Sequence, residues 1–193
     1  MKRVCVFCGS REGSRPSYAE ATRRVGRILA RQGRRIVYGG GRVGLMGALA
    51  DAALKEGGEV IGVIPEALLT RELAHPDLTE LHVVGTMHER KKLMADLSDG
   101  FITLPGGYGT LEEFAEVLSW AQLSIHEKPC ALLELDGYWE PLSRLLDRAV
   151  AEGFAIPDHR ALVLMQQDIH NLLDLMDRYT PPKAKEWIKP QDL

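Results

Sequence analysis

The chain has 193 residues, of which 45% are hydrophobic and 26% are charged, and its formal net charge is −3. That length suits one hydrophobic core, and the negative balance argues against a nucleic-acid partner, because phosphate backbones are normally met by a cationic excess. No apolar run approaches the roughly 18 residues of a membrane span, and the first residues lack the pattern of a signal peptide, so we expect a cytoplasmic protein without a membrane partner.

Short apolar runs alternate with amphipathic segments along the whole chain. In chain order, the first half predicts a strand over residues 4–7, a helix over 16–32, a strand over 35–38, a helix over 45–55 and a strand over 60–64. After a looser stretch over 66–79, the second half predicts a strand over 81–84, a helix over 87–97, a strand over 101–104, a helix over 110–123, a strand over 130–135, a helix over 138–152, a strand over 161–165 and a helix over 169–179.

This alternation of strands and helices predicts an α/β fold. Near-continuous apolar strands are typical of a parallel sheet that is covered by helices on both faces. Right-handed crossovers then make it a doubly wound, mostly parallel, Rossmann-like sheet. We expect a single domain over residues 1–180, followed by an irregular tail over 181–193.

The three cysteines bear on compartment and on metal binding. An odd, low count suits a reducing cytosol better than a secreted disulfide framework. Cys5 and Cys8 form a C-x-x-C pair in or beside a predicted strand, where buried thiols are the simpler explanation. A structural zinc would need four ligands, and neither a second such pair nor paired histidines supply them, so we expect no metal site.

Two glycine-rich loops follow predicted strands and precede predicted helices. The first contains Gly39, Gly40, Gly41, Gly44 and Met46, and the second runs over 105–113. Glycine lets a backbone approach an anion closely, and the N–H groups at a helix start point at it. Both loops can also be explained as tight turns in which glycine satisfies only sterics. Two such loops in one chain favour an anionic ligand.

Neither loop has a standard nucleotide signature. A Walker loop needs a Lys-Ser or Lys-Thr pair that is missing here. Residues 39–44 satisfy the spacing of a dinucleotide fingerprint, but they follow the second strand, and the next strand is not followed by the required acidic residue. Dinucleotide binding is therefore disfavoured.

Charged residues near the second loop indicate chemistry beyond phosphate binding. Glu112 and Glu113 stand at the start of a predicted helix, where acids also gain about 0.3–1 kcal/mol from the helix dipole. Adjacent helical residues diverge by about 100°, so only one of them can face a ligand squarely. A carboxylate beside a phosphate loop suits a substrate on which positive charge develops, as in glycosidic cleavage. Arg90 and Lys91 can supply cations, although a solvated helix face also explains them.

These residues carry a family resemblance that spans roughly residues 3–179. The matching motifs are Cys8-Gly9-Ser10, Tyr38-Gly39-Gly40-Gly41, Gly44-Leu45-Met46-Gly47, Met87-His88-Glu89-Arg90-Lys91 and Pro105-Gly106-Gly107-Tyr108-Gly109-Thr110-Leu111-Glu112-Glu113. With them the chain resembles the LOG ("Lonely Guy") family of cytokinin riboside 5′-monophosphate phosphoribohydrolases, long labelled as possible lysine decarboxylases.

The resemblance implies a cytoplasmic homodimer that hydrolyses purine and cytokinin nucleoside 5′-monophosphates, AMP included, to free base and ribose 5-phosphate. This chemistry requires no cofactor and no metal. By the same resemblance Arg90 and Glu113 are the catalytic pair, and Glu72, Lys91 and Glu112 are further substrate contacts. The phosphate loop that it implies consists of Gly106, Gly107, Tyr108, Gly109 and Thr110.

The expected mechanism joins both lines of reasoning. The 5′-phosphate would lie on the phosphate loop, Glu113 would stabilise positive charge on the ribose, and Arg90 would hold the substrate and keep Glu113 ionised. Decarboxylation of lysine has little support, because it usually needs pyridoxal phosphate on a Schiff-base lysine. The alternative is a non-catalytic nucleotide-binding or sensing module, which would have no use for the acid beside the loop. The sequence leaves the preferred base open.

Overall fold

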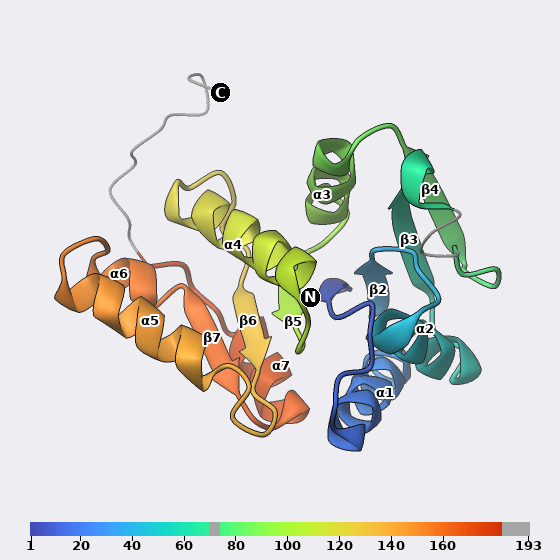
Figure 1. Cartoon of the computed structure of the whole chain (residues 1–193), viewed down its shortest axis with the longest axis horizontal. Coiled ribbons are helices and arrows are strands. Elements are labelled where there is room, and N and C mark those ends of the chain that lie inside the picture. Colours follow the sequence, from blue (N-terminus) through green and yellow to red (C-terminus); the bar gives the residue numbers. More distant parts are fainter. Residues whose placement is uncertain (70–73, 183–193) are drawn as a thin grey trace.

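Seven parallel strands form one sheet in the computed structural model, which describes residues 1–69 and 74–182 (Figure 1). Their order is β4-β3-β2-β1-β5-β6-β7, and every pairing between neighbours is parallel. The strands are β1 (Arg3–Phe7), β2 (Arg35–Tyr38), β3 (Val60–Pro65), β4 (Glu80–Val84), β5 (Gly100–Thr103), β6 (Cys130–Leu133) and β7 (Val163–Gln166).

Helices connect these strands, as the alternating pattern predicted. They are α1 (Pro16–Arg31), α2 (Gly44–Lys55), α3 (Met87–Asp96), α4 (Tyr108–Gln122), α5 (Glu140–Ala151), α6 (Pro157–Arg160) and α7 (Ile169–Asp177). The doubly wound α/β fold is confirmed, and the ends of the predicted elements are displaced by no more than two residues. The sequence did not predict α6 or the 3-10 helix Glu66–Leu68, because elements this short show no hydrophobic period.

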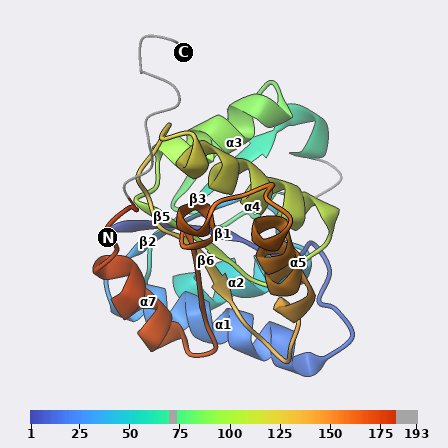
Figure 2. The ribbon, with the colours of Figure 1, turned by 90° about the vertical axis from the view of Figure 1, so that its left-hand side faces the viewer.

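The helices cover both faces of the sheet (Figure 2). One core layer lies between the sheet and α1, α2 and α7, and it includes Leu29, Leu49 and Leu172. The other lies between the sheet and α3, α4 and α5, and it includes Met94 and Phe114. Side chains alternate between the faces of a strand, so an inner strand such as β1 contributes to both layers, with Val4 and Val6 in the first and Cys5 and Phe7 in the second.

All three cysteines are buried free thiols. Cys5 and Cys8 are three residues apart on and after β1, and they enter opposite core layers. The C-x-x-C pair therefore forms neither a disulfide nor one half of a metal site.

The direction in which the chain winds across the sheet reverses between β1 and β5. From β1 the chain proceeds to β2, β3 and β4 on one side, and from β5 it proceeds to β6 and β7 on the other. The loops after β1 and β5 lie side by side, since the Gly9 N–H donates a 3.1 Å hydrogen bond to the Pro105 carbonyl. Ligands of open α/β sheets bind at such a reversal, outside the carboxyl ends of the strands.

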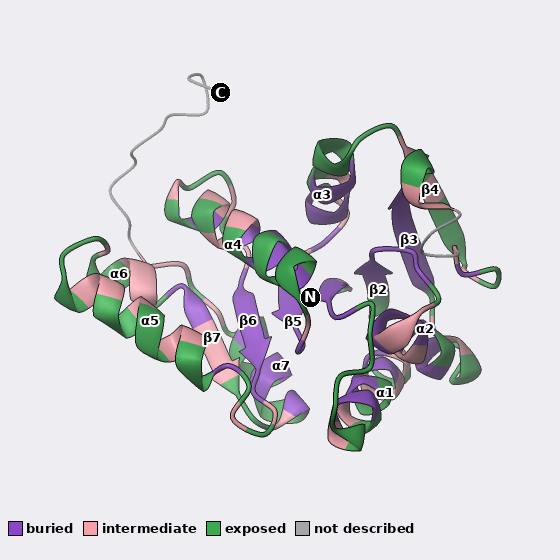
Figure 3. Cartoon of the chain, in the orientation of Figure 1, coloured by how far each residue is buried: buried purple, intermediate pink, exposed green. Residues whose placement is uncertain are grey.

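Burial varies strongly across the molecule (Figure 3). The central strands β2, β3, β5 and β6 are almost entirely buried, whereas the edge strand β4 is half-exposed. Helix α5 contains no fully buried residue, although its apolar side chains gather on one face. Among the described residues, no helix is long and apolar enough to cross a membrane.

Candidate active site

Helix α3 places Arg90 at the carboxyl edge of the sheet. The helix starts at a capping box, in which the Thr86 hydroxyl accepts the Glu89 N–H at 3.1 Å and the Glu89 carboxylate accepts the Thr86 N–H. One turn later, the Arg90 side chain is only 5% exposed, and its Nη2 donates to the Gly39 carbonyl at 3.2 Å. This anchor holds a buried guanidinium in a fixed position.

Helix α4 places Glu113 opposite that guanidinium. Glu113 Oε1 lies 3.8 Å from Arg90 Nη2, and the Glu113 side chain is 10% exposed. The neighbouring Glu112 side chain is 53% exposed. Of the two adjacent acids, the fold therefore turns Glu113 inward to the arginine, whereas Glu112, about 100° away around the helix, is the more exposed.

The two side chains share a cavity of about 370 Å³. Its lining comes from the loops after β1 and β5, the 3-10 helix after β3 and the starts of α2, α3 and α4. It consists of Cys8, Ser10, Met46, Leu68, Met87, Arg90, Gly107, Tyr108, Gly109, Thr110, Glu112 and Glu113. The structure thus brings together most of the residues that the sequence pointed to. Glu72 lies outside the described residues.

The second glycine loop forms one wall of the cavity and starts α4. Gly107 is the N-cap of α4, and no side chain caps this end of the helix. A Cβ on Gly107 or Gly109 would meet nothing within 4 Å, whereas one on Gly106 would lie 2.1 Å from Thr110 Oγ1. The Tyr138 hydroxyl also donates to the Gly106 carbonyl. Gly106 therefore fixes the shape of the loop, and the residues after it present an open helix N-terminus to an anion.

In the first glycine loop, backbone carbonyls accept hydrogen bonds from the protein's own side chains. The Gly39 carbonyl accepts from Arg90, and the Tyr38 hydroxyl donates to the Gly41 carbonyl at 3.1 Å. A Cβ on Gly44 would lie 2.3 Å from the Ser10 carbonyl carbon. Met46 lines the cavity, but Gly40, Gly41 and Gly44 are not among the described lining residues. The steric explanation fits this loop, and its contribution to the site is the anchor for Arg90.

Lys91 is held by two carboxylates of α4. Its ammonium group contacts Glu112 and lies 3.0 Å from Glu116 Oε1, and its side chain is 7% exposed. Burial lowers the pKa of Lys91, but the hydrogen bonds that its ammonium group donates to Glu112 and Glu116 outweigh burial and raise that pKa above its ordinary value. Sequence reasoning missed Glu116, although its spacing of four residues from Glu112 puts both acids on one face of α4.

Cys8 is a further lining residue that the sequence did not identify. Burial and then the nearby Glu113 raise the pKa of its thiol well above the ordinary range. Cys8 therefore contributes a neutral thiol to the cavity and not a thiolate nucleophile. Its place directly after the first strand was the available signal, because that strand borders the point where the sheet reverses.

A second, more apolar cavity of about 510 Å³ also borders the second glycine loop. Ser10, Gly107 and Tyr108 line both cavities. Tyr18 and Tyr138 also line it, with ring centroids 5.9 Å apart in an edge-to-face arrangement. The second glycine loop, which precedes α4 and is called the α4 loop below, therefore borders both cavities.

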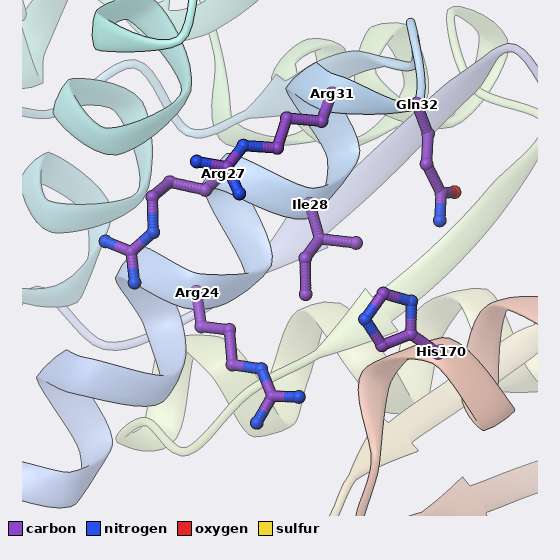
Figure 4. A pocket seen from close by; sticks show the side chains of 6 residues that line it. All are labelled: Arg24, Arg27, Ile28, Arg31, Gln32 and His170. Atoms are coloured by element: carbon purple, nitrogen blue, oxygen red, sulfur yellow. The ribbon is translucent and has the colours of Figure 1, made fainter.

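A third hollow, of about 400 Å³, lies between α1 and α7 and shares no lining residue with the cavity of Arg90 and Glu113 (Figure 4). It is lined by Arg24, Arg27, Ile28, Arg31, Gln32 and His170. Asp168 lies 3.4 Å from Arg24, and Glu56 accepts two 2.9 Å hydrogen bonds from Arg31. Because these acids neutralise much of the positive charge, we assign no chemistry to this hollow. No group of acids, histidines and cysteines that could hold a metal ion occurs among the described residues.

Known proteins with similar sequences point to one family. The family described as "possible lysine decarboxylase" matches residues 46–176. A cytokinin riboside 5′-monophosphate phosphoribohydrolase of Rhodococcoides fascians is 51% identical over 173 residues, which cover 89% of this chain and 87% of that protein. A relative in Arabidopsis thaliana with the same descriptive name is 47% identical over 180 residues, covering 93% and 83%. A probable enzyme of this name in Oryza sativa subsp. japonica is 49% identical over 180 residues, covering 93% and 79%.

Solved structures with similar folds include more distant proteins. The molybdenum cofactor binding protein of Rippkaea orientalis superposes with a TM-score of 0.68 at 23% identity, covering 92% of this chain and 96% of that one. The molybdenum cofactor carrier protein of Chlamydomonas reinhardtii gives a TM-score of 0.69 at 19% identity, covering 91% and 96%. At these identities the likeness concerns the fold alone.

Proposed function

This chain belongs to the family of cytokinin riboside 5′-monophosphate phosphoribohydrolases, and on that premise we propose that it hydrolyses the N-glycosidic bond of purine nucleoside 5′-monophosphates to free base and ribose 5-phosphate. The observation that carries this proposal is the buried pair of Arg90 and Glu113, 3.8 Å apart, in a cavity that also contains the open N-terminus of α4.

Binding begins at the open end of α4. A 5′-phosphate on the loop from Gly106 to Thr110 accepts hydrogen bonds from first-turn N–H groups and meets the positive end of the helix dipole. The Thr110 hydroxyl adds a donor at the third residue of the helix. The phosphate thereby places the ribose over the next turn of α4, where Glu113 lies.

Bond cleavage places positive charge on the ribose. The bond between C1′ and the base nitrogen breaks, its electron pair leaves with the base, and water adds a hydroxyl to C1′ and a proton to the base. The Glu113 carboxylate stabilises the oxocarbenium-like transition state and orients the water. Arg90 lies 3.8 Å from that carboxylate, places a positive charge beside it and is itself fixed by the Gly39 carbonyl.

The family description as a lysine decarboxylase does not match the lysine at this site. A Schiff-base lysine works as a neutral amine with a lowered pKa. The pKa of Lys91 is instead raised, because two carboxylates hold its ammonium form. Lysine decarboxylation therefore does not fit Lys91.

The decisive experiment measures base release. The protein is incubated separately with AMP and with isopentenyl-adenosine monophosphate, and free base is separated by chromatography. Release from either is expected, and Glu113→Gln is expected to lower turnover by about 100-fold or more. Glu140→Gln, an exposed acid in the first turn of α5, is the matched control and should keep full turnover. The ratio of the two rates identifies the preferred base.

A non-catalytic nucleotide-binding module is the alternative function. It predicts that the protein binds AMP and returns it intact after hours, with the same affinity in Glu113→Gln. The buried acid and arginine favour hydrolysis, since phosphate binding by itself gains nothing from a carboxylate beside the loop.

A homodimer in the cytoplasm completes the proposal. The amphipathic α5 and the segment after it expose Leu145, Phe154 and Ile156, large apolar side chains that a partner subunit would cover. Sedimentation of the wild type as a dimer, and of Leu145→Arg as a monomer, is the expected result. The three free thiols support a reducing compartment.

A further inference from the structure

Lys91 connects the two helices that carry Arg90 and Glu113. It follows Arg90 directly on α3, so the two side chains point about 100° apart. Arg90 reaches Gly39 and Glu113, while Lys91 reaches the face of α4 that presents Glu112 and Glu116. The adjacent cations Arg90 and Lys91 of α3 therefore contact carboxylates on two different faces of α4.

Because of its contacts, the Lys91 side chain has little exposed surface with which to bind a substrate. Its side chain is 7% exposed, its ammonium group contacts two carboxylates, and it is not among the described residues that line the cavity. Glu116 is itself mostly buried, at 22% exposure, and its other carboxylate oxygen has no hydrogen-bond partner among the described residues. Without Lys91, both acids would repel each other and Glu113 from the same stretch of α4.

We propose that Lys91 is a positioning residue, which holds α3 against α4 through Glu116 and Glu112 and so sets the distance between Arg90 and Glu113. This inference rests on the proposed hydrolase function and assigns Glu116 a role in it. It differs from a direct contact between Lys91 and the substrate phosphate. A shift of about 1 Å between the reacting groups of an enzyme can cost about 100-fold in rate.

The two roles predict different kinetics. If Lys91 positions the catalytic pair, Lys91→Met should lower kcat for AMP at least tenfold, while KM and the Kd of ribose 5-phosphate change no more than about threefold. If Lys91 binds the phosphate, the loss of a charge-assisted hydrogen bond should weaken the Kd of ribose 5-phosphate by about tenfold or more.

Lys92 provides the matched control. It is the next residue on α3 and pairs with Asp96 on the same helix at 2.5 Å, on an exposed face. Lys92→Met removes the same charge without touching α4, and kcat, KM and the Kd of ribose 5-phosphate should stay at wild-type values. Lys91→Arg, whose two-pronged cation can span both acids, should recover most of kcat.

Glu116→Gln keeps the test valid if Lys91→Met does not fold. Glutamine retains a hydrogen bond to Lys91 without the charge, and kcat should fall with little change in KM. Combining Glu116→Gln with Lys91→Met should lower kcat no further than Lys91→Met does, because both changes break one connection. A tenfold weaker Kd of ribose 5-phosphate in Lys91→Met, or independent effects of the two changes, would overturn the positioning role.

Failure of the proposed function gives a separate result. If the wild type releases no base from any nucleotide, the hydrolase proposal fails, and ribose 5-phosphate binding still reports on Lys91. Amide hydrogen exchange in α3 should then rise in Lys91→Met and not in Lys92→Met. Unchanged exchange in both variants would refute the connection between the helices.

Discussion

Substituting Gly39 by alanine tests the anchor of Arg90. A Cβ at position 39 would lie 1.9 Å from Arg90 Nη2, while real Cβ atoms essentially never come closer than 3.0 Å to another heavy atom. The guanidinium must therefore shift by at least about 1 Å from its present place beside the Gly39 carbonyl and Glu113. Arginine is flexible and can move, so the fold should remain stable. A displacement of this size predicts a loss of about 100-fold in kcat, or about 2.7 kcal/mol in transition-state stabilisation.

The assay compares base release from AMP and the melting temperature in wild type and Gly39→Ala. Gly33→Ala is the matched control. Gly33 has a φ of +65° and nothing within 4 Å of an added Cβ, so this substitution should cost about 1 kcal/mol of stability and leave kcat unchanged. Near-normal kcat in Gly39→Ala, at an unchanged melting temperature, would refute the role of the anchor. A large loss of stability in Gly39→Ala would refute the assumption that only Arg90 moves.

Three other features of the structure give further predictions. The Arg34 guanidinium, with the N-terminal amine, lowers the pKa of Asp177 to about 2. Asp177 therefore stabilises the fold at pH values above its usual pKa near 3.8, and this contribution is lost as the pH falls through 2. In urea titrations, Asp177→Asn should lower the free energy of unfolding by about 1 kcal/mol at pH 7, after allowance for screening, and this difference should disappear as the pH falls below 2. Burial raises the pKa of all three cysteines, that of Cys130 to about 12. A thiol-specific disulfide reagent at pH 8 should therefore label no cysteine in the native protein and three after denaturation. One rapidly labelled native thiol would contradict this. Thr86→Ala removes the cap of α3 and should cost about 1 kcal/mol by denaturant unfolding, with Thr86→Ser close to wild type; equal losses in both would show that the methyl group, and not the hydroxyl, matters.

Much of the fold follows from local sequence pattern. Apolar runs such as 60–64 can be satisfied only in a strand that is buried on both faces, and the helix at 16–32 has one apolar stripe that ends at a glycine. Such signals place the elements to within two residues. These signals do not predict short elements such as α6, because four residues are too few to show a hydrophobic period.

The candidate site was predictable only in part. Glycines and charged residues after strands indicated an anion site, and the fold brings Arg90, Glu113 and the α4 loop to one cavity. Sequence spacing did not reveal Cys8 as part of the site, nor the anchoring contact of Gly39 with Arg90. Both depend on the order β2-β1-β5, which brings loops that are far apart in the chain to the same edge.

The sequence by itself determined which residue types are present and how they are spaced, and that spacing holds Glu112 about 100° from Glu113 and one turn from Glu116. Only the tertiary structure decided how far α4 is rotated about its axis, and with it that Glu113 meets Arg90 while Glu112 and Glu116 meet Lys91. The physical reason is that helical periodicity fixes angles between side chains of one helix, whereas the packing of Phe114 and Val117 into the core fixes the direction in which those side chains point.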